Sequence, residues 1–264
     1  MRKLDLVKAY NDWTQGVKKR SLWSYLALQE IKRRYRRSTL GPFWITISMT
    51  IMIFAMGPLY SQIFKVNLAN YFLYLSIGYI VWNLIFNTIN DLTESFLSSE
   101  KFIKQIRLPI SIYILKIIYK NFIVFFHNSL VIILIYLIYP PENYEMIWLL
   151  PFGLILLFIN FIWIGVFISF ICTRYRDLNQ LVTNLLQISF FLTPILWKIS
   201  MLDQYQKLIN FNFFYHLINV LRGPIISDPS SIFSFYVLSL TSFVGLILAF
   251  IFFAKYRARI SYWI

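Results

Sequence analysis

The chain has 264 residues, of which 59% are hydrophobic, 20% are aromatic and 14% are charged, and its formal net charge is +14 at pH 7. This composition is more apolar and less charged than that of a soluble globular domain, and it excludes that class of protein. In a bilayer, backbone polar groups must pair within a helix or a closed barrel. Because the apolar runs are longer than the ~10 residues of a barrel strand, we expect an all-α integral membrane protein.

Residues 1–40 are basic and polar, and we expect a cytoplasmic segment here rather than a cleaved signal peptide. Within 21–37, Ala27, Ile31 and Tyr35 recur every four residues, which predicts an amphipathic helix in the membrane interface. Such a helix serves either as a membrane anchor or as a docking surface for a cytoplasmic partner. Its polar face carries the basic residues Lys32, Arg33, Arg34, Arg36 and Arg37.

Six runs are free of charged residues over about the 20 residues that cross a ~30 Å hydrocarbon core, and each predicts a transmembrane helix. We expect one transmembrane domain over 1–264, with a six-span bundle at 41–254 and a cytoplasmic tail at 255–264. The runs cover residues 41–64, 66–90, 121–141, 146–173, 178–197 and 229–254.

Lysine and arginine residues lie unevenly along the chain. Eleven of the 25 precede residue 41, five lie at 101–120, and five more lie at 174–176 and 255–259. Basic residues near the ends of spans are retained in the cytoplasm. We therefore expect both termini to be cytoplasmic, which requires an even number of spans. Anionic lipid headgroups account for the net charge, so we expect no nucleic-acid partner.

A short cytoplasmic helix is expected at 98–109, between the second and third spans, because serines precede it and a proline ends it. Three apolar residues about one turn apart give it one apolar face. That face suits either a groove in a protein partner or lipid. The candidate contact residues are Glu100, Lys101, Phe102, Ile103, Lys104, Ile106 and Arg107.

The outer segment 198–229 is too apolar for a loop in free solution. We expect re-entrant or interfacial helices here, with a turn at Gly223–Pro224 before the last span. Aromatic residues are also more numerous than interfacial belts require. Since aromatic rings stack on sugar faces, four of them are candidates for a channel lining, with packing against lipid as the alternative. They are Tyr60, Phe190, Phe191 and Trp197.

Motifs for catalysis and energy coupling are missing from the sequence. No G-x-x-x-x-G-K-[ST] motif occurs, so the chain does not hydrolyse ATP through a P-loop. His127 and His216 have no metal-ligand spacing, so we expect no metal site and assign both to hydrogen-bonded structural roles. Ion-driven transport needs ionisable groups at membrane depth, and Lys116 and Lys120 are expected to reach the cytoplasmic interface instead. A separate ATPase subunit is the simplest energy source.

Four stretches of the sequence form a recognisable set of motifs. The first is R-Y-x-x-S-x-L-G-x-x-W, from Arg34 to Trp44, and the second is the K-x-x-R-L-P ending of 102–109. The third is Y-R-D-L at 175–178, and the fourth is F-L-T-P-I-L-W at 191–197. With these motifs the chain resembles, over nearly its whole length, the permeases of type 2 ABC exporters that move lipid-linked polysaccharides, the Wzm and teichoic-acid group.

The resemblance implies a homodimer of six-helix permeases with two cytoplasmic ABC ATPase subunits, which bind Mg-ATP, so that this chain needs no cofactor of its own. It implies a channel at the dimer interface for an undecaprenyl-linked polysaccharide such as O-antigen, in lipopolysaccharide biosynthesis at the bacterial inner membrane. Residues 98–108 match the family's coupling helix, and the helix before Gly41 matches its interface helix. The segment after Trp197 matches helices that dip into the outer leaflet. A cytoplasmic loop carries the motif residues Tyr175, Arg176 and Asp177.

The expected mechanism is mechanical: ATP binding closes the partner subunits, and residues 100–107 and 32–37 pass the movement to the spans. The arginines of the second range would meet the lipid pyrophosphate, since guanidinium forks suit phosphate, or would only anchor the helix. A drug- or lipid-exporting ABC permease is one alternative, and a membrane enzyme acting on lipid-linked sugars is another. Few carboxylates are expected on the outer face, which argues against the enzyme.

Overall fold

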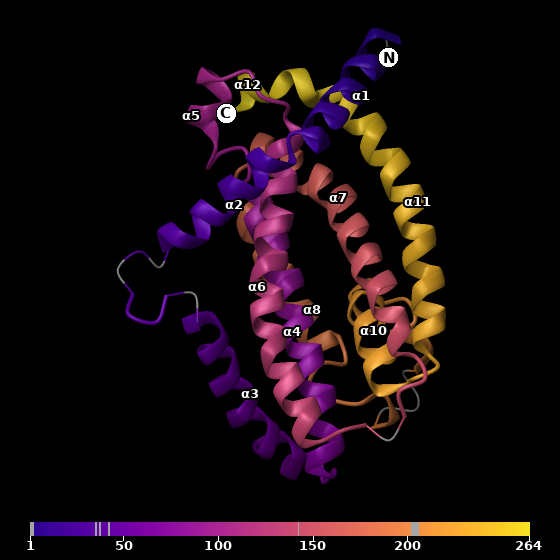
Figure 1. Cartoon of the computed structure of the whole chain (residues 1–264). Helices are drawn as coiled ribbons and strands as arrows, with labels where there is room; N and C mark the ends of the chain where they lie inside the picture. The colour runs from indigo at the N-terminus through magenta and orange to yellow at the C-terminus, as the bar shows by residue number, and fades with distance from the viewer. Residues whose placement is uncertain (1–2, 35, 37, 42, 142, 202–205) are drawn as a thin grey trace.

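The computed structural model describes residues 3–34, 36, 38–41, 43–141, 143–201 and 206–264, and all regular secondary structure in these ranges is helical. Both ends of the chain lie at the same end of the bundle (Figure 1). Five helices are long and apolar enough to cross a bilayer, so this is a multi-pass membrane protein. They are α3 (Phe43–Ile63), α4 (Leu68–Thr93), α6 (Ser111–Ile138), α7 (Leu150–Arg174), preceded by the 3-10 turn η1 (Ile147–Leu149), and α11 (Ser231–Tyr256).

The sixth expected span, residues 178–197, contains a shorter helix. α8 (Leu178–Leu192) has 15 residues, which corresponds to about 22 Å at 1.5 Å per residue. The helix ends before Pro194 because the residue preceding a proline is driven into extended backbone, as Thr193 is. Within α8, all of which is described, Leu186 is the single buried residue. The helix is therefore largely uncovered in the isolated chain.

Asp12 connects the start of the chain to two of the long helices. It lies in α1 (Lys3–Lys18), and its carboxylate accepts hydrogen bonds of 3.1 Å from the backbone N–H groups of Ile110 and Ser111 at the start of α6. Arg257, just beyond α11, lies 3.1 Å from the same carboxylate. An anion at a helix N-terminus satisfies N–H groups that have no partner within the helix. This carboxylate thus holds α1 against both α6 and α11.

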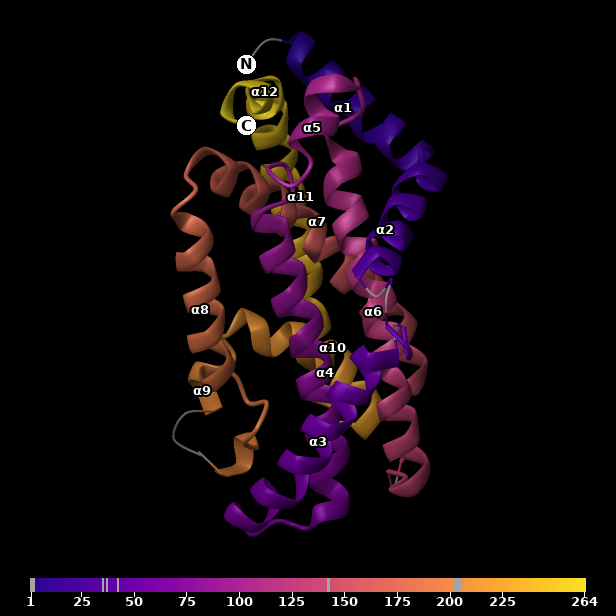
Figure 2. The same cartoon turned by 90° about the vertical axis from the view of Figure 1, so that its left-hand side faces the viewer.

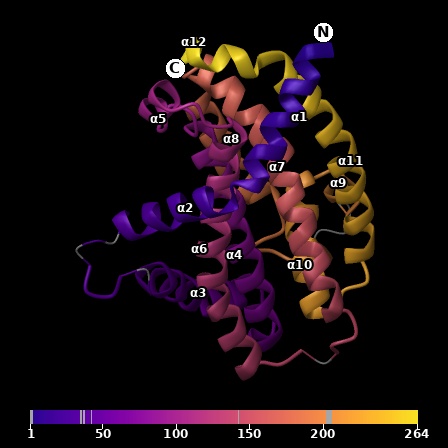
Figure 3. The ribbon, with the colours of Figure 1, turned by 45° about the horizontal axis from the view of Figure 1, so that its top comes forward.

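Short helices gather at the end of the bundle that holds both termini (Figure 3). α2 (Arg20–Arg34) extends away from this end and covers the predicted amphipathic segment as far as the described residues allow, since Tyr35 and Arg37 lie outside them. The remaining short elements here are α5 (Glu100–Gln105), the 3-10 turn η4 (Arg257–Arg259) and α12 (Ile260–Trp263).

The outer segment folds back into the bundle. It contains η2 (Ile199–Met201), α9 (Gln206–Ile209) and α10 (Phe213–Ile226), and α10 packs against α4, α7 and α11. The predicted turn at Gly223–Pro224 is wrong, because both residues lie within α10 and the chain turns at Ser227, which has a φ of 53°. Gly223 serves close packing instead, since a Cβ there would lie 2.2 Å from the Cβ of Ser231 at the start of α11.

α4 is the central helix of the bundle. It contacts α3, α6, α7, α8 and α10, and most of its residues are buried. Both histidines are hydrogen-bonded within the bundle, as predicted. The His216 ring lies 3.0 Å from Ser234 Oγ and 2.8 Å from the Asn210 carbonyl oxygen, and His127 Nδ1 lies 2.9 Å from the carbonyl oxygen of Ile123.

Candidate functional site

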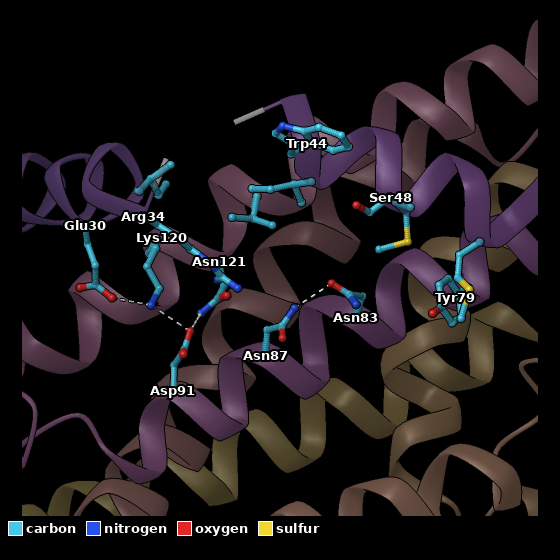
Figure 4. Close-up of a pocket in the computed structure, with 15 residues that line it drawn as sticks. Glu30, Arg34, Trp44, Ser48, Tyr79, Asn83, Asn87, Asp91, Lys120 and Asn121 are labelled. Carbon is cyan, nitrogen blue, oxygen red and sulfur yellow. Dashed lines mark hydrogen bonds and ion pairs between the residues drawn. The ribbon is translucent and has the colours of Figure 1, made fainter. Parts of the chain in front are cut away.

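A cleft of about 890 Å³ opens between α2, α3, α4 and α6 (Figure 4). Figure 2 looks onto this side of the bundle, where α4 lies between α8 and α6 and α3 stands in front of its lower part. Apolar residues of α3 form part of one wall, whereas α4 and α6 supply polar groups. The lining includes Trp44, Asn83, Asn87, Asp91, Lys120 and Asn121.

One face of α4 forms the polar wall of this cleft. Residues 71–91, all of which are described, are buried except for six that recur at helical spacing. A helix surface that faces lipid is apolar, because hydrocarbon offers polar groups no partner. This surface is polar over most of its length, so it suits contact with water, a ligand or another protein. The six residues are Tyr79, Asn83, Phe86, Asn87, Asn90 and Asp91.

Two asparagines at the middle of this face are joined to each other. Asn87 Nδ2 donates a 2.7 Å hydrogen bond to Asn83 Oδ1, four residues earlier on α4. A carboxamide has two N–H donors and an oxygen with two lone pairs, so this bond leaves capacity on both side chains. Figure 4 shows these amides following one another along α4 toward Tyr79. The wall therefore offers both donors and acceptors to whatever occupies the cleft.

Charged residues are concentrated at one end of the cleft. Lys120 Nζ lies 2.6 Å from Glu30 Oε1 and 3.0 Å from Asp91 Oδ2, and Lys116 Nζ lies 2.9 Å from Glu30 Oε2. Asn121 Nδ2 donates a 2.7 Å hydrogen bond to Asp91. This network joins α2, α4 and α6. The two lysines are thus held in ion pairs. They lie in α6, which begins ten residues before the expected span.

The network also stabilises the ionised form of Glu30. Burial of this carboxyl opposes ionisation, but the hydrogen bonds and positive charges of Lys120 and Lys116 outweigh it and hold the pKa of Glu30 below its ordinary value. The carboxylate is thus a fixed negative charge on α2.

The sequence interpretation did not identify this site. Asp91 lies one residue beyond the charge-free run 66–90, and Glu30 lies within a polar helix, so a search for charges inside spans passed over both. A detectable signal was present, because Asn83, Asn87 and Asp91 recur every four residues. That spacing places three polar side chains on one face of a helix.

The expected contact helix for a partner lies at the end of the bundle that holds both termini (Figure 1). None of the six residues of α5, all described, is buried, and Phe102 and Ile106 are 53% and 49% exposed. A 2.6 Å ion pair joins Lys104 to Glu100, and the hydrogen bond from Lys104 lowers the pKa of Glu100, with the charge of Arg176 acting in the same direction. Ser99 occupies the N-cap position, but its side chain makes no capping bond. Lys101, Lys104 and Arg107 are exposed, and Ile103 is half-buried.

The motif Tyr175-Arg176-Asp177 lies at the corner between α7 and α8. All three residues are exposed, and Asp177 occupies the N-cap position of α8. The preceding Arg174 places its guanidinium 5.1 Å from the Tyr175 ring centre and 5.5 Å from that of Trp263 in α12. These contacts attach the corner to the C-terminal helix near α5.

The predicted basic residues of the amphipathic segment divide between surface and cleft. Lys32, Arg33 and Arg34 form the last turn of α2, all exposed, and Arg34 also lines the cleft. Arg36 is exposed, and Arg37 lies outside the described residues.

The four aromatic candidates for a channel lining lie near the end of α8, and the ring centre of Phe190 is 6.3 Å from that of Tyr79 in the cleft wall. Tyr60 and Phe190 pack against a small buried cluster of Tyr71, Leu75 and Leu196. Phe191 is exposed, and its carbonyl oxygen accepts a 3.2 Å hydrogen bond from Trp197 Nε1. Trp197 and its neighbours are thus held by local packing, and none of the four lines the cleft in the described part of the chain.

A buried arginine fixes the segment between α8 and η2. Arg222 of α10 is 1% exposed, and its Nη1 donates a 2.7 Å hydrogen bond to the carbonyl oxygen of Pro194. Its guanidinium lies 4.0 Å from the ring centre of Tyr74, a cation–π contact. The Tyr74 hydroxyl lies 3.0 Å from the Pro194 carbonyl oxygen and 3.1 Å from that of Trp197.

Comparison with known proteins gives two results. The sequence profile of the family described as "ABC-2 type transporter" matches residues 21–226. The "O-antigen export system permease protein RfbA" of Myxococcus xanthus is 22% identical over 181 residues, which cover 69% of this chain and 70% of that protein. Two proteins of the same name from Klebsiella pneumoniae are 22% and 23% identical over 186 residues, which cover 70% of this chain and 72% of each relative.

Proposed function

Because the chain belongs to the ABC-2 type transporter family, we propose that it is the channel-forming subunit of an ATP-driven exporter that moves a lipid-linked polysaccharide, such as O-antigen, across the bacterial inner membrane. The observation that carries this proposal is the polar, partly exposed face of α4, which borders a cleft between long apolar helices. The three relatives named as O-antigen export permeases support the substrate class. In this assignment the chain is a permease and not an enzyme.

The exporter contains two copies of this chain. α8 buries one residue, Leu186, in the isolated chain, and exposes Leu181, Leu185 and Ile188. The cleft is lined by residues of α2, α3, α4 and α6, and Figure 2 looks onto this side of the bundle. A second copy facing this side would cover α8 and enclose the polar face of α4, so that two half-channels make one path.

ATP hydrolysis takes place on a separate cytoplasmic subunit that binds Mg-ATP. The sequence has no P-loop, and α5 presents exposed apolar side chains at one end of the bundle. Short apolar helices of this kind fit a groove in a protein partner. In this assignment α5 couples the ATPase to the spans, both termini are cytoplasmic, and α10 and its neighbours occupy the outer leaflet.

The basic end of α2 has a separate part in this scheme. Arg34 lines the cleft, and Arg33 and Arg36 are exposed beside it. Guanidinium groups bind phosphate through paired hydrogen bonds. These arginines would receive the pyrophosphate of the lipid carrier as the glycan enters.

The coupling assignment is tested by charge substitution on α5. The double variant Phe102→Asp, Ile103→Asp should still insert into the membrane. It should abolish surface polysaccharide and the part of ATP hydrolysis that depends on the permease. The control replaces Tyr262, an 87% exposed aromatic residue at the same end of the chain, with Asp. Normal polysaccharide export by the α5 variant, at a normal protein level, would reject α5 as the coupling helix.

A further inference from the structure

We propose that the face of α4 formed by Tyr79, Asn83 and Asn87 is the surface along which the exporter recognises uncharged, hydroxyl-rich sugar units. This inference rests on the proposed export function. It places the path along α4, where the ring centre of Tyr79 lies 6.3 Å from that of Phe190, one of the four aromatic residues that the sequence indicated.

The first argument is the exposure of this face. Residues 71–91 are buried everywhere except along one stripe, and four of its six residues carry amide or carboxylate groups. Amides on a lipid-facing surface would lose their hydrogen bonds to water without replacement. The stripe borders a cleft of about 890 Å³, which is large enough to hold sugar units or water. The stripe is thus a surface that needs a polar occupant.

The second argument is the chemistry of the amides. A sugar hydroxyl both donates and accepts hydrogen bonds, and a carboxamide does the same. Asn83 and Asn87 are bonded to each other at 2.7 Å, which orients both amides and leaves donor and acceptor capacity on each. The ring of Tyr79 lies one turn before Asn83 in α4, and Trp44 of α3 lies across the cleft (Figure 4). Aromatic rings supply an apolar face for the C–H side of a sugar.

The third argument is the distribution of charge. The ionised groups that line the cleft lie at one end, where Glu30 and Asp91 are paired with Lys116 and Lys120 and where Arg34 also lies (Figure 4). From Asp91 toward the start of α4, the stripe continues through neutral amides to Tyr79. A sugar unit with a net charge would meet no counter-charge along these amides, and burying an unpaired charge is costly. The wall therefore favours neutral sugars over acidic ones.

Cysteine labelling tests whether this face meets water. Cys172 is the single cysteine of the chain and is buried, so Cys172→Ser supplies a background without reactive thiols. In membranes that contain the complete exporter, Asn83→Cys and Asn87→Cys should react with a charged, membrane-impermeant maleimide. Leu84→Cys, at a buried neighbour, should not react, and Val244→Cys, on the exposed side of α11, should react only with an apolar maleimide.

Two results of the labelling would overturn the inference. Reaction of the Asn83 and Asn87 positions with the apolar reagent alone would mean that the stripe faces lipid. Efficient disulfide formation between two copies at these positions, without labelling by the charged reagent, would mean that the stripe is a closed contact between subunits.

Export measurements test sugar recognition. Asn83→Leu combined with Asn87→Leu preserves side-chain size and should lower surface polysaccharide about tenfold, the effect of losing one or two hydrogen bonds. Asn70→Leu, an exposed asparagine earlier on α4 and outside the stripe, should retain export within about twofold, as surface substitutions usually do. Normal export by the double variant would reject the inference. If the wild-type protein exports no polysaccharide, the proposed function fails instead, while labelling still reports on the cleft.

Discussion

Lys120 in α6 and Glu30 in α2 form an ion pair with 2.6 Å between Nζ and Oε1. Ninety residues separate them in the sequence. Because Lys120 also contacts Asp91 of α4 at 3.0 Å, one ammonium group connects the basic amphipathic helix to two membrane helices. These ion pairs therefore attach α2 to the polar wall of the cleft.

Glu30→Gln should weaken this connection. The neutral amide loses the charge attraction to Lys116 and Lys120, and we expect a loss of about 1–2 kcal/mol, a range reduced by partial exposure to solvent. Thermal unfolding in detergent measures the effect. Glu94→Gln, at an exposed carboxylate just after α4, is the control and should leave the unfolding temperature unchanged. Equal unfolding temperatures for Glu30→Gln and wild type would contradict the prediction.

Acidification should produce the same weakening in the wild-type protein. The pKa of Glu30 is lowered in the folded state, so its stabilising effect is complete above the unfolded-state pKa and is lost as the pH falls through the folded-state value. The difference in unfolding temperature between wild type and Glu30→Gln should therefore narrow as the pH is lowered from about 6 to below about 4. A difference that stays constant over this range would exclude Glu30 as the responsible group.

Tyr74→Phe should loosen the segment that follows α8. The substitution removes the hydroxyl that is shared between the carbonyl oxygens of Pro194 and Trp197, at a cost of about 1–2 kcal/mol. Unfolding temperature and hydrogen exchange at 193–198 report the change. Tyr236→Phe, at a tyrosine that is 71% exposed, is the matched control. Unchanged exchange in Tyr74→Phe would show that the other bonds to this segment, from Arg222 to the Pro194 carbonyl oxygen and from the Tyr71 hydroxyl to the Leu196 carbonyl oxygen, hold it without Tyr74.

Gly153→Ala should disturb the packing of α7 against α10. A Cβ at this position would lie 2.6 Å from the backbone carbonyl oxygen of Val220, and backbone cannot move aside as a flexible side chain can. We expect a loss of about 1–3 kcal/mol from this overpacking. Gly78→Ala is the control, because its Cβ would meet its nearest neighbours at 3.4–3.6 Å. The unfolding temperatures of both variants are measured. A Gly153→Ala protein that unfolds at the same temperature as Gly78→Ala would contradict the predicted clash.

Periodicity and apolar run length were sufficient to predict much of the fold. They predicted the helical class, five spans and a helix before the first span, which ends at Arg34, because these features depend on neighbours within one segment. The motifs from Arg34 to Trp44 and at 175–178 were sufficient to indicate the transporter family. The helix at 100–105 was also predicted, since its flanking serines and proline are local signals.

Only the tertiary structure decided which side chains share the candidate site. Asn83 and Asn87 could have faced the core or the lipid, and their exposure follows from how α3, α6 and α8 surround α4. Gly223 was read as a turn because its requirement for close packing against Ser231 is invisible in one segment. Distant ion pairs such as Glu30 with Lys120 arise from chain folding. Local sequence determines where helices form, but the partners of their polar groups depend on the arrangement of the whole bundle.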